Sequence, residues 1–315
     1  GALSRHWYVL LLPLYCLAST LWSDYPAVTF RFSLQLLATF AVALTAATRL
    51  APATFHRALF LVFLSVIAAS LVAGNVRDFD GAWLGVFGSK NALAAASATF
   101  LVLAAALVMD RHAPAALRCL ALFGLPAGLV LLVMAKSTGA LLISAPVLLA
   151  VPVLILSRRL SAPQKLAGAV LAVAALMLAL ALFLSFREVI FAALLDRTGK
   201  DATLTGRTGL WRVAMSHIAE RPLFGLGYQA FWVQTNASAE ALWRMFGIAG
   251  RGGFNFHNTY ISNAVEIGIV GVTLQVAVLY SALIGAGIWA LRSHRAEAAG
   301  LFALVLMVTA SSFIE

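Results

Sequence analysis

Two side chains in the last third of the sequence suit proton transfer and anion binding. His257 stands in the run FNFHNTYISNAVEIGIVG, at the start of a long apolar segment. An imidazole with an ordinary pKa of about 6.5 can accept a proton from a hydroxyl group at neutral pH. Arg207 stands in the run TGRTGLWRVAMSHIAER, and a guanidinium group binds phosphate through paired hydrogen bonds. They are our candidates for a general base and an anion-binding group.

The segment around Arg207 predicts a short amphipathic helix over residues 205–221. Thr205 is the expected N-cap, and Pro222 ends the helix. Arg207 then lies in the first turn with Trp211 one turn below it, where free backbone N–H groups also attract a phosphate. Alternatively, Arg207 pairs with an acidic side chain or reaches lipid headgroups. The apolar residues recur at spacings of three and four: Leu210, Trp211, Ala214, Met215 and Ile218.

The elements that position these residues follow from an unusually apolar composition. Of the 315 residues, 62% are hydrophobic and 11% are charged, whereas a soluble domain has roughly a quarter of its residues charged. The chain therefore belongs in a bilayer. Its net charge of +10 indicates orientation signals and anionic lipid rather than nucleic acid.

About nine apolar runs are long enough to cross a membrane. They should all be helices, because unpaired backbone groups are costly in hydrocarbon and the runs lack the alternation of barrel strands. We predict an all-α polytopic membrane protein. The expected spans cover residues 7–22, 27–48, 55–74, 92–109, 117–134, 140–156, 166–186, 259–289 and 298–314.

Basic residues in the connections 48–57, 110–118 and 157–165 predict the orientation, because such clusters are typical of cytoplasmic loops. The N-terminus is then cytoplasmic, and a long partly helical loop lies on the other side of the membrane. That loop holds eight basic and five acidic residues, a net charge of +3, which indicates either a solvated loop or an anion-binding surface. The expected parts are N-terminal transmembrane helices, the loop domain and C-terminal transmembrane helices, residues 1–186, 187–258 and 259–315.

This topology separates His257 from most other histidines. Only His217 and His257 are expected outside the cytoplasm, and His217 stands in the middle of the predicted helix, where a packed side chain is the simpler interpretation. Glu266 is an acid inside an apolar run, which favours a function. It lies nine residues beyond His257 and faces away from it on a straight helix, so we do not pair the two. The four cytoplasmic histidines are His6, His56, His112 and His294.

The run PLFGLGYQAFW predicts a tight turn at Gly225 and Gly227, followed by aromatic residues. Tyr228 and its aromatic neighbours suit either an interfacial belt or a platform for a sugar ring. The outer segment has no DxD or HExxH motif, and the chain has no Walker loop. We therefore expect no metal or cofactor and a donor that carries its own activated leaving group. A lipid diphosphate held by arginines meets that need.

These residues resemble the O-antigen ligase and polymerase superfamily, and most closely its exopolysaccharide polymerases. The runs GRTGLW and RPLFGLGYQAFW are similar to the family's Gly-Arg-Thr-x-x-Trp helix and Pro-x-x-Gly-x-Gly turn. His257 and Asn258, followed by Gly268 and Gly271, match its His-Asn-x9-Gly-x-x-Gly pattern. The resemblance implies that Arg207 holds the donor diphosphate and that His257 activates the acceptor hydroxyl.

The family usually has a further basic residue in a Ser-Arg-like motif where a span leaves the outer face. The matching stretch here is AKSTGALL, in which Lys136 precedes the serine. This departure leaves Arg212, Lys90 and Arg31 as alternatives for the second phosphate contact. The expected substrate-binding residues are Lys136, Arg212, Asn258, Tyr228 and Trp211.

The resemblance implies a GT-C-like, metal-independent, inverting glycosyltransferase. It would polymerise undecaprenyl-diphosphate-linked oligosaccharides at the periplasmic face of a bacterial inner membrane. The acceptor is another glycan, or lipid A-core if the protein is an O-antigen ligase, and a chain-length regulator is a further partner to consider. A flippase for lipid-linked glycan is the alternative from a different class, although the sequence shows neither inverted repeats nor broken helices.

Overall fold

The structure is a computed structural model that describes residues 7–314 except 79, 158–159, 199–206 and 253. Over these residues it is almost entirely helical, and its only extended pairing is an isolated bridge between Val76 and Trp83. Six of the described helices are long and apolar enough to span a membrane. The prediction of an all-α polytopic membrane protein is confirmed.

Helical structure lies in each of the nine predicted spans, but the first, residues 7–22, is divided among three short helices. Two further helices lie in the loop segment. The loop helices are α9 (Arg207–Glu220) and α10 (Ala237–Met245). The others are η1 (Trp7–Leu10), α2 (Leu11–Ala18), η2 (Ser19–Leu21), α3 (Pro26–Arg49), α4 (Pro52–Ala73), α5 (Lys90–Val108), α6 (Ala115–Met134), α7 (Thr138–Leu156), α8 (Ala162–Thr198), α11 (Thr259–Arg292) and α12 (Ala296–Ser311).

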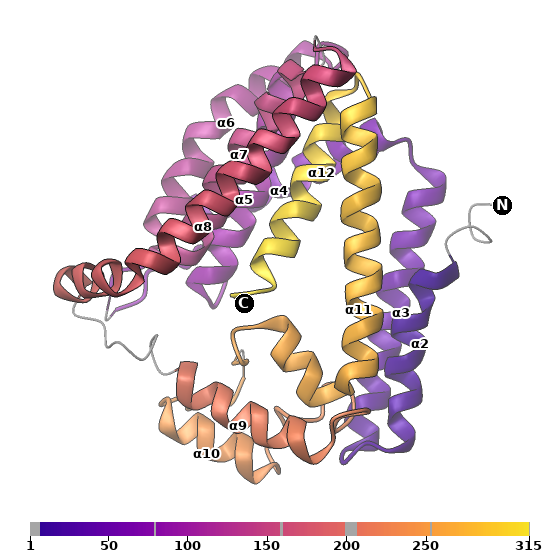
Figure 1. Cartoon of the computed structure of the whole chain (residues 1–315), viewed down its shortest axis with the longest axis vertical. Helices are drawn as coiled ribbons and strands as arrows, with labels where there is room; N and C mark the ends of the chain where they lie inside the picture. Colours follow the sequence, from indigo (N-terminus) through magenta and orange to yellow (C-terminus); the bar gives the residue numbers. More distant parts are fainter. Residues whose placement is uncertain (1–6, 79, 158–159, 199–206, 253, 315) are drawn as a thin grey trace.

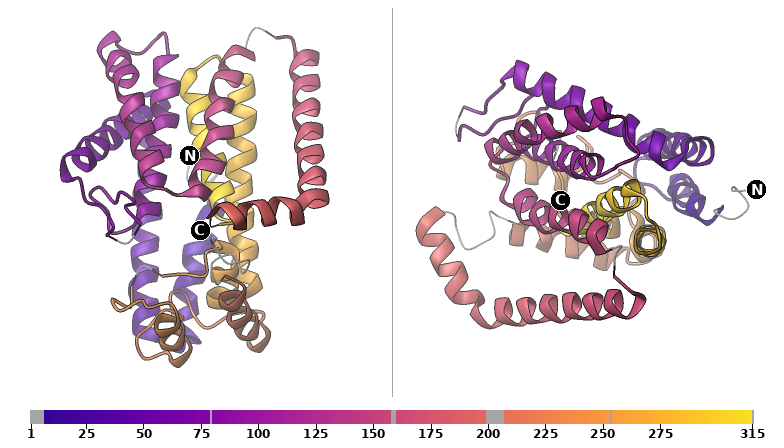
Figure 2. Two further views of the ribbon diagram at one scale, coloured as in Figure 1. Left: turned by 90° about the vertical axis from the view of Figure 1, so that its left-hand side faces the viewer. Right: turned by 90° about the horizontal axis from the view of Figure 1, so that it is seen from above.

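The helices form two groups that meet at one end of the molecule and diverge toward the loop helices (Figure 1). One group contains α4 to α8 and α12, and the other contains α2, α3 and α11. The long helix α8 lies on the outside and bends before its end (Figure 2). Because α8 continues to Thr198, helical structure extends beyond residue 186, where we expected the loop domain to begin.

Helix α5 is the centre of the first group, because its small residues allow neighbours to approach closely. Two thirds of its apolar window are buried (67%). Phe100 of α5 lies against Gly124 and Gly128 of α6, where an added β-carbon would come within 2.7 Å of its ring. The same ring stacks on Phe60 of α4 at 5.6 Å.

Helix α11 is broken at Gly268, whose φ of 62° is left-handed. The turn at residues 222–227 fills the break: Ile269 N–H donates to Pro222 O at 2.9 Å, and Gly227 N–H donates to Glu266 O at 2.8 Å. An added β-carbon on Gly268 would lie 2.3 Å from Leu223 O. The two glycine-containing runs therefore form one interlocked structure, which supplies partners for backbone groups that the break frees.

The loop helices share a small aromatic core with the start of α11. Leu210 of α9, Phe231, Trp243 of α10 and Phe256 are almost fully buried. Phe231 lies 4.8 Å from Phe256, measured between ring centroids. This core fixes α9 beside the chain segment that carries His257.

Candidate functional site

Arg207 is the first residue of α9 and is only partly exposed. The prediction that it lies in the first turn is confirmed, and so is the end of the helix before Pro222. The expected N-cap, Thr205, lies outside the described residues. Trp211, one turn below Arg207, donates its indole N–H to Phe256 O at 2.8 Å. That bond ties α9 to the residue preceding His257.

His257 has a left-handed backbone, with φ of 51°. Few non-glycine residues adopt this conformation, and those that do are concentrated at functional sites. The side chain of Asn255 stabilises it by accepting a hydrogen bond from His257 N–H at 2.7 Å. The imidazole meets the ring of Phe254 edge-on, with 5.7 Å between the centroids. Asn255 therefore fixes the backbone of His257, and Phe254 contacts the imidazole ring.

Arg207 and His257 interact electrostatically. Burial lowers the pKa of His257 below its ordinary value, and the positive charge of Arg207 lowers it further. The imidazole is thus neutral at pH 7, the form that accepts a proton. An anion bound by Arg207 would lie close to this base.

Asn258 caps helix α11. Its Oδ1 accepts a hydrogen bond from Ile261 N–H at 3.0 Å, and its Nδ2 donates to Phe313 O at 3.1 Å. Thr259 N–H donates to Ser312 O at 2.9 Å. Both ends of the Asn258 amide are thus used within the protein, and the start of α11 is attached to the end of α12.

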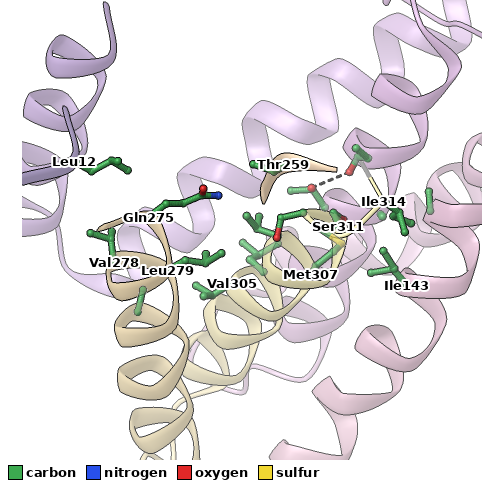
Figure 3. Close-up of a pocket in the computed structure, with 18 residues that line it drawn as sticks. Leu12, Ile143, Thr259, Gln275, Val278, Leu279, Val305, Met307, Ser311 and Ile314 are labelled. Atoms are coloured by element: carbon green, nitrogen blue, oxygen red, sulfur yellow. Dashed lines mark hydrogen bonds between the residues drawn. The ribbon is translucent and has the colours of Figure 1, made fainter. Parts of the chain in front are cut away.

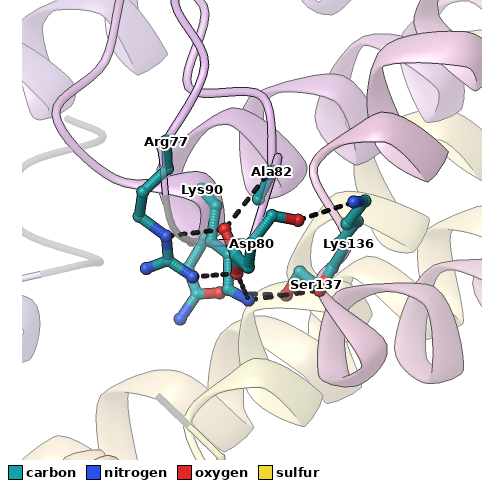
Figure 4. Close-up of polar contacts among 7 residues, drawn as sticks. Arg77, Asp80, Ala82, Lys90, Lys136 and Ser137 are labelled. Atoms are coloured by element: carbon teal, nitrogen blue, oxygen red, sulfur yellow. Dashed lines mark hydrogen bonds and ion pairs between the residues drawn. The ribbon is translucent and has the colours of Figure 1, made fainter.

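Lys136 lies in a basic cluster formed with Arg77, Asp80 and Lys90 (Figure 4). Its Nζ donates to Asp80 O at 2.6 Å, and Lys90 Nζ lies 3.3 Å from Asp80 Oδ2. Arg77 forms a two-pronged ion pair with the same carboxylate. The Arg77 guanidinium holds the pKa of Asp80 well below its usual range. Two cations, Arg77 and Lys90, therefore share one ionised carboxylate, while Lys136 bonds the backbone carbonyl of the same residue. Exposed Asp78 is next to Arg77 in the chain.

The end of α12 connects this basic cluster to the histidine. An added β-carbon on Gly139, in the first turn of α7, would lie 2.7 Å from Ile314 Cδ1. The preceding residue, Phe313, is the one whose carbonyl accepts from Asn258. The segments that carry Lys136 and His257 therefore both contact the same short stretch of chain.

An apolar cavity of about 630 Å³ opens beside this stretch, between α2, α5, α7, α11 and α12 (Figure 3). Thr259, two residues after His257, is at its polar edge together with Ser311 and Ser312. The walls are almost entirely hydrocarbon: Leu12, Ala95, Ala98, Ala140, Ile143, Val278, Leu279, Ala282, Leu304, Val305, Met307, Val308 and Ile314.

The remaining candidates lie apart from His257. Tyr228 packs near Cys16 and Glu266, about two helical turns along α11, and burial raises its pKa. Arg212 is exposed, about 140° around α9 from Arg207 by helical geometry. Arg31 lies over the ring of Phe32 at 4.6 Å. Binding roles for Tyr228 and Arg212 stay predictions.

Sequence reasoning missed Arg77 and Asp80. Their spacing of three residues in the loop between two predicted spans is the signal that could have found them, since an Arg and an Asp so placed can pair. Within the described ranges, no three His, Cys, Asp or Glu side chains gather as metal ligands would.

Comparison with known proteins gives two matches. Residues 120–276 match a family model described as O-antigen ligase. The chain is also 31% identical over 297 residues to the exopolysaccharide production protein ExoQ of Rhizobium meliloti (strain 1021), an alignment that covers 90% of this chain and 66% of that relative. The chain therefore belongs to the O-antigen ligase and polymerase superfamily.

Proposed function

We propose that this protein is a metal-independent glycosyltransferase that polymerises lipid-diphosphate-linked oligosaccharides at the periplasmic face of a bacterial inner membrane. One observation carries the proposal: His257 interacts electrostatically with Arg207, and Thr259, two residues beyond the histidine, lines a cavity with hydrocarbon walls. Such a site suits a substrate that combines a hydroxyl acceptor, a diphosphate and a long apolar tail. Undecaprenyl diphosphate is the carrier that we propose.

In the proposed reaction, a ring nitrogen of His257 takes the proton of an acceptor hydroxyl. The hydroxyl oxygen then forms a bond to the anomeric carbon of the donor sugar, with inversion. The bond between that carbon and the diphosphate oxygen breaks, and the electron pair leaves with the lipid diphosphate. Arg207 stabilises the leaving negative charge, since a preorganised cation is most effective where charge develops.

The basic cluster around Lys136 supplies the second part of the proposed diphosphate site. Lys90 bonds the carboxylate of Asp80 and Lys136 bonds its carbonyl oxygen, and Gly139, three residues beyond Lys136, lies against Ile314 after the end of α12. The lipid tail occupies the apolar cavity between them and α11. In this proposal the basic side chains neutralise the diphosphate in place of a metal ion, so EDTA is expected to leave the transfer rate unchanged.

The similarity to an exopolysaccharide production protein favours polymerase over ligase, because a polymerase uses a second lipid-linked glycan as acceptor. Supplying that acceptor and lipid A-core separately, with one labelled donor, distinguishes the two. Product on lipid A-core alone would replace our proposal with the ligase activity.

The decisive test is reconstitution of the full chain in liposomes with an undecaprenyl-diphosphate oligosaccharide. His257→Ala is expected to lower polymer formation by about 10²-fold or more, the size typical of losing a general base. His217→Ala is the matched control, since His217 packs against Phe231 at 5.3 Å and bonds Ser238 at 3.1 Å. Full activity in His257→Ala would refute the catalytic assignment, and lipid-linked glycan crossing the bilayer without polymer would identify a flippase.

A further inference from the structure

A second cavity, of about 370 Å³, lies at the end of the helix bundle opposite the loop helices. It is formed where α5 ends, α6 begins, α7 ends and α12 begins. The proposed orientation puts this end at the cytoplasmic surface of the membrane. The glycan-transfer site makes no use of it.

The polar wall of this cavity is cationic. Arg118 uses Nε to bond Val108 O at 3.3 Å, and within the described part of the chain its terminal amino groups have no hydrogen-bond partner. Arg111 is exposed and forms no ion pair with any described residue. The rings of His112 and His294 complete this wall.

The acidic groups of this end do not neutralise the wall. Asp110 also lines the cavity, but its carboxylate is buried and already engaged: one oxygen lies 3.7 Å from Arg57 and the other accepts from His112 N–H at 2.9 Å. Glu297 is buried in the first turn of α12 but does not line the cavity. Ala296, the first residue of α12, does line it, and that helix has no side-chain N-cap. Free N–H groups there add to the attraction for an anion.

The opposite wall is apolar and faces the bilayer. Ile155 and Leu156 of α7 form it, and Leu156 is 62% exposed at the helix surface. A soluble phosphate ester would gain nothing from such a wall. A phospholipid would gain from both sides, because its phosphate meets the cations while its acyl chains stay in hydrocarbon.

We infer that this cavity binds the phosphate headgroup of an anionic phospholipid. The lipid bridges the start of α6 and the start of α12, the helix whose far end is attached to Asn258. The site is independent of the proposed glycosyl transfer and would persist in a protein with another activity.

Native mass spectrometry of the purified full chain tests this inference, with phosphatidylglycerol, cardiolipin and phosphatidylethanolamine offered in equal amounts. Wild type is expected to retain an anionic lipid in preference to phosphatidylethanolamine. Arg111→Gln/Arg118→Gln should reduce that preference on the order of tenfold, since the lipid phosphate loses both arginines that line the cavity. Arg49→Gln, at the exposed end of α3, is the matched control and should leave the preference unchanged.

Three outcomes would overturn the inference: no preference in wild type, the same preference in the double variant, or an equal loss in Arg49→Gln. A competition arm with inorganic diphosphate separates the two sources of phosphate. Binding of inorganic diphosphate with no retained lipid would assign the cavity to a soluble phosphate compound and also overturn the lipid assignment. Circular dichroism of each variant confirms that it is folded.

Discussion

The ionisation of His257 depends on its neighbours. Burial and the charge of Arg207 both lower its pKa, so the base form persists to more acidic pH than for a free imidazole. An enzyme that needs the base form gains activity as pH rises through this pKa. The midpoint of the acidic limb of its pH–rate profile should therefore lie at a pH below the ordinary pKa of histidine, about 6.5.

Arg207→Gln removes the charge that Arg207 places near His257, so the pKa of the imidazole should rise. The acidic limb of kcat/KM is then expected to move to higher pH, and the maximal rate should fall by about 10²-fold as a diphosphate contact is lost. Arg207→Lys keeps the charge and should keep the position of the limb. Rates at closely spaced pH values measure both effects. An unmoved limb in Arg207→Gln would argue against electrostatic coupling of the two residues.

Sequence alone predicted His257 and Arg207 as candidates, because the residue types, the expected topology and the family pattern all agree on them. It did not predict how they are brought together. The Trp211 indole reaches Phe256 O across 45 residues of chain, and no local pattern encodes such a bond. Sequence also did not predict that the amide of Asn258 caps α11 and bonds Phe313 O, and its role in binding substrate stays a prediction.

Among the elements, the broken helix α11 determines where His257 stands. Hydropathy predicted a single span over residues 259–289. A hydropathy pattern depends on composition and does not show that the backbone at Gly268 is non-helical. The break at Gly268 divides α11 into a short N-terminal piece and a long remainder. The turn at Gly225 and Gly227 was predicted from its glycines, but its contact with the break in α11 was not. Gly225 packs directly on the backbone of Glu266, because an added β-carbon there would lie 2.5 Å from Glu266 C.

Gly268→Ala is expected to disrupt this interlock. Its β-carbon would overlap Leu223 O, and its φ disfavours any side chain, a combination that costs about 2 kcal/mol or more. Thermal unfolding in detergent should show a lower Tm, and transfer activity should fall with it. Gly285→Ala is the control in the same helix, where nothing lies within 4 Å. Equal Tm values for the two variants would contradict the assigned role of the break.

At the scale of the molecule, two groups of helices enclose the apolar cavity near the site. The number and placement of the apolar runs predicted the helices, but cavities depend on how side chains fill the space between them. The net positive charge of the long loop predicted a basic outer surface without naming its contacts. It did not reveal that Lys136 and Lys90 gather around Asp80.

Ala282→Phe tests whether the cavity holds the lipid tail. Ala282 lines the cavity from α11 and is exposed to it, so a phenyl ring there narrows the space without overpacking a core. We expect kcat/KM for an undecaprenyl donor to fall roughly tenfold, in line with about 1–3 kcal/mol of lost apolar binding. A donor with a short isoprenoid tail should be affected far less.

Ile284→Phe is the matched control, because Ile284 is 61% exposed two residues further along α11 and does not line the cavity. It should leave the kinetics of both donors unchanged. If Ala282→Phe slowed the long and short donors equally, the cavity would have no part in recognising the tail.

The attachment of α11 to the end of α12 also bears on biosynthesis. Membrane helices are made and inserted from the N-terminus onward, yet the cap beside His257 relies on Phe313, and Thr259 relies on Ser312. A nascent chain that has released α9 and α11 from the ribosome still lacks these partners. We therefore expect the segment around His257 to reach this arrangement only after α12 has been inserted into the membrane.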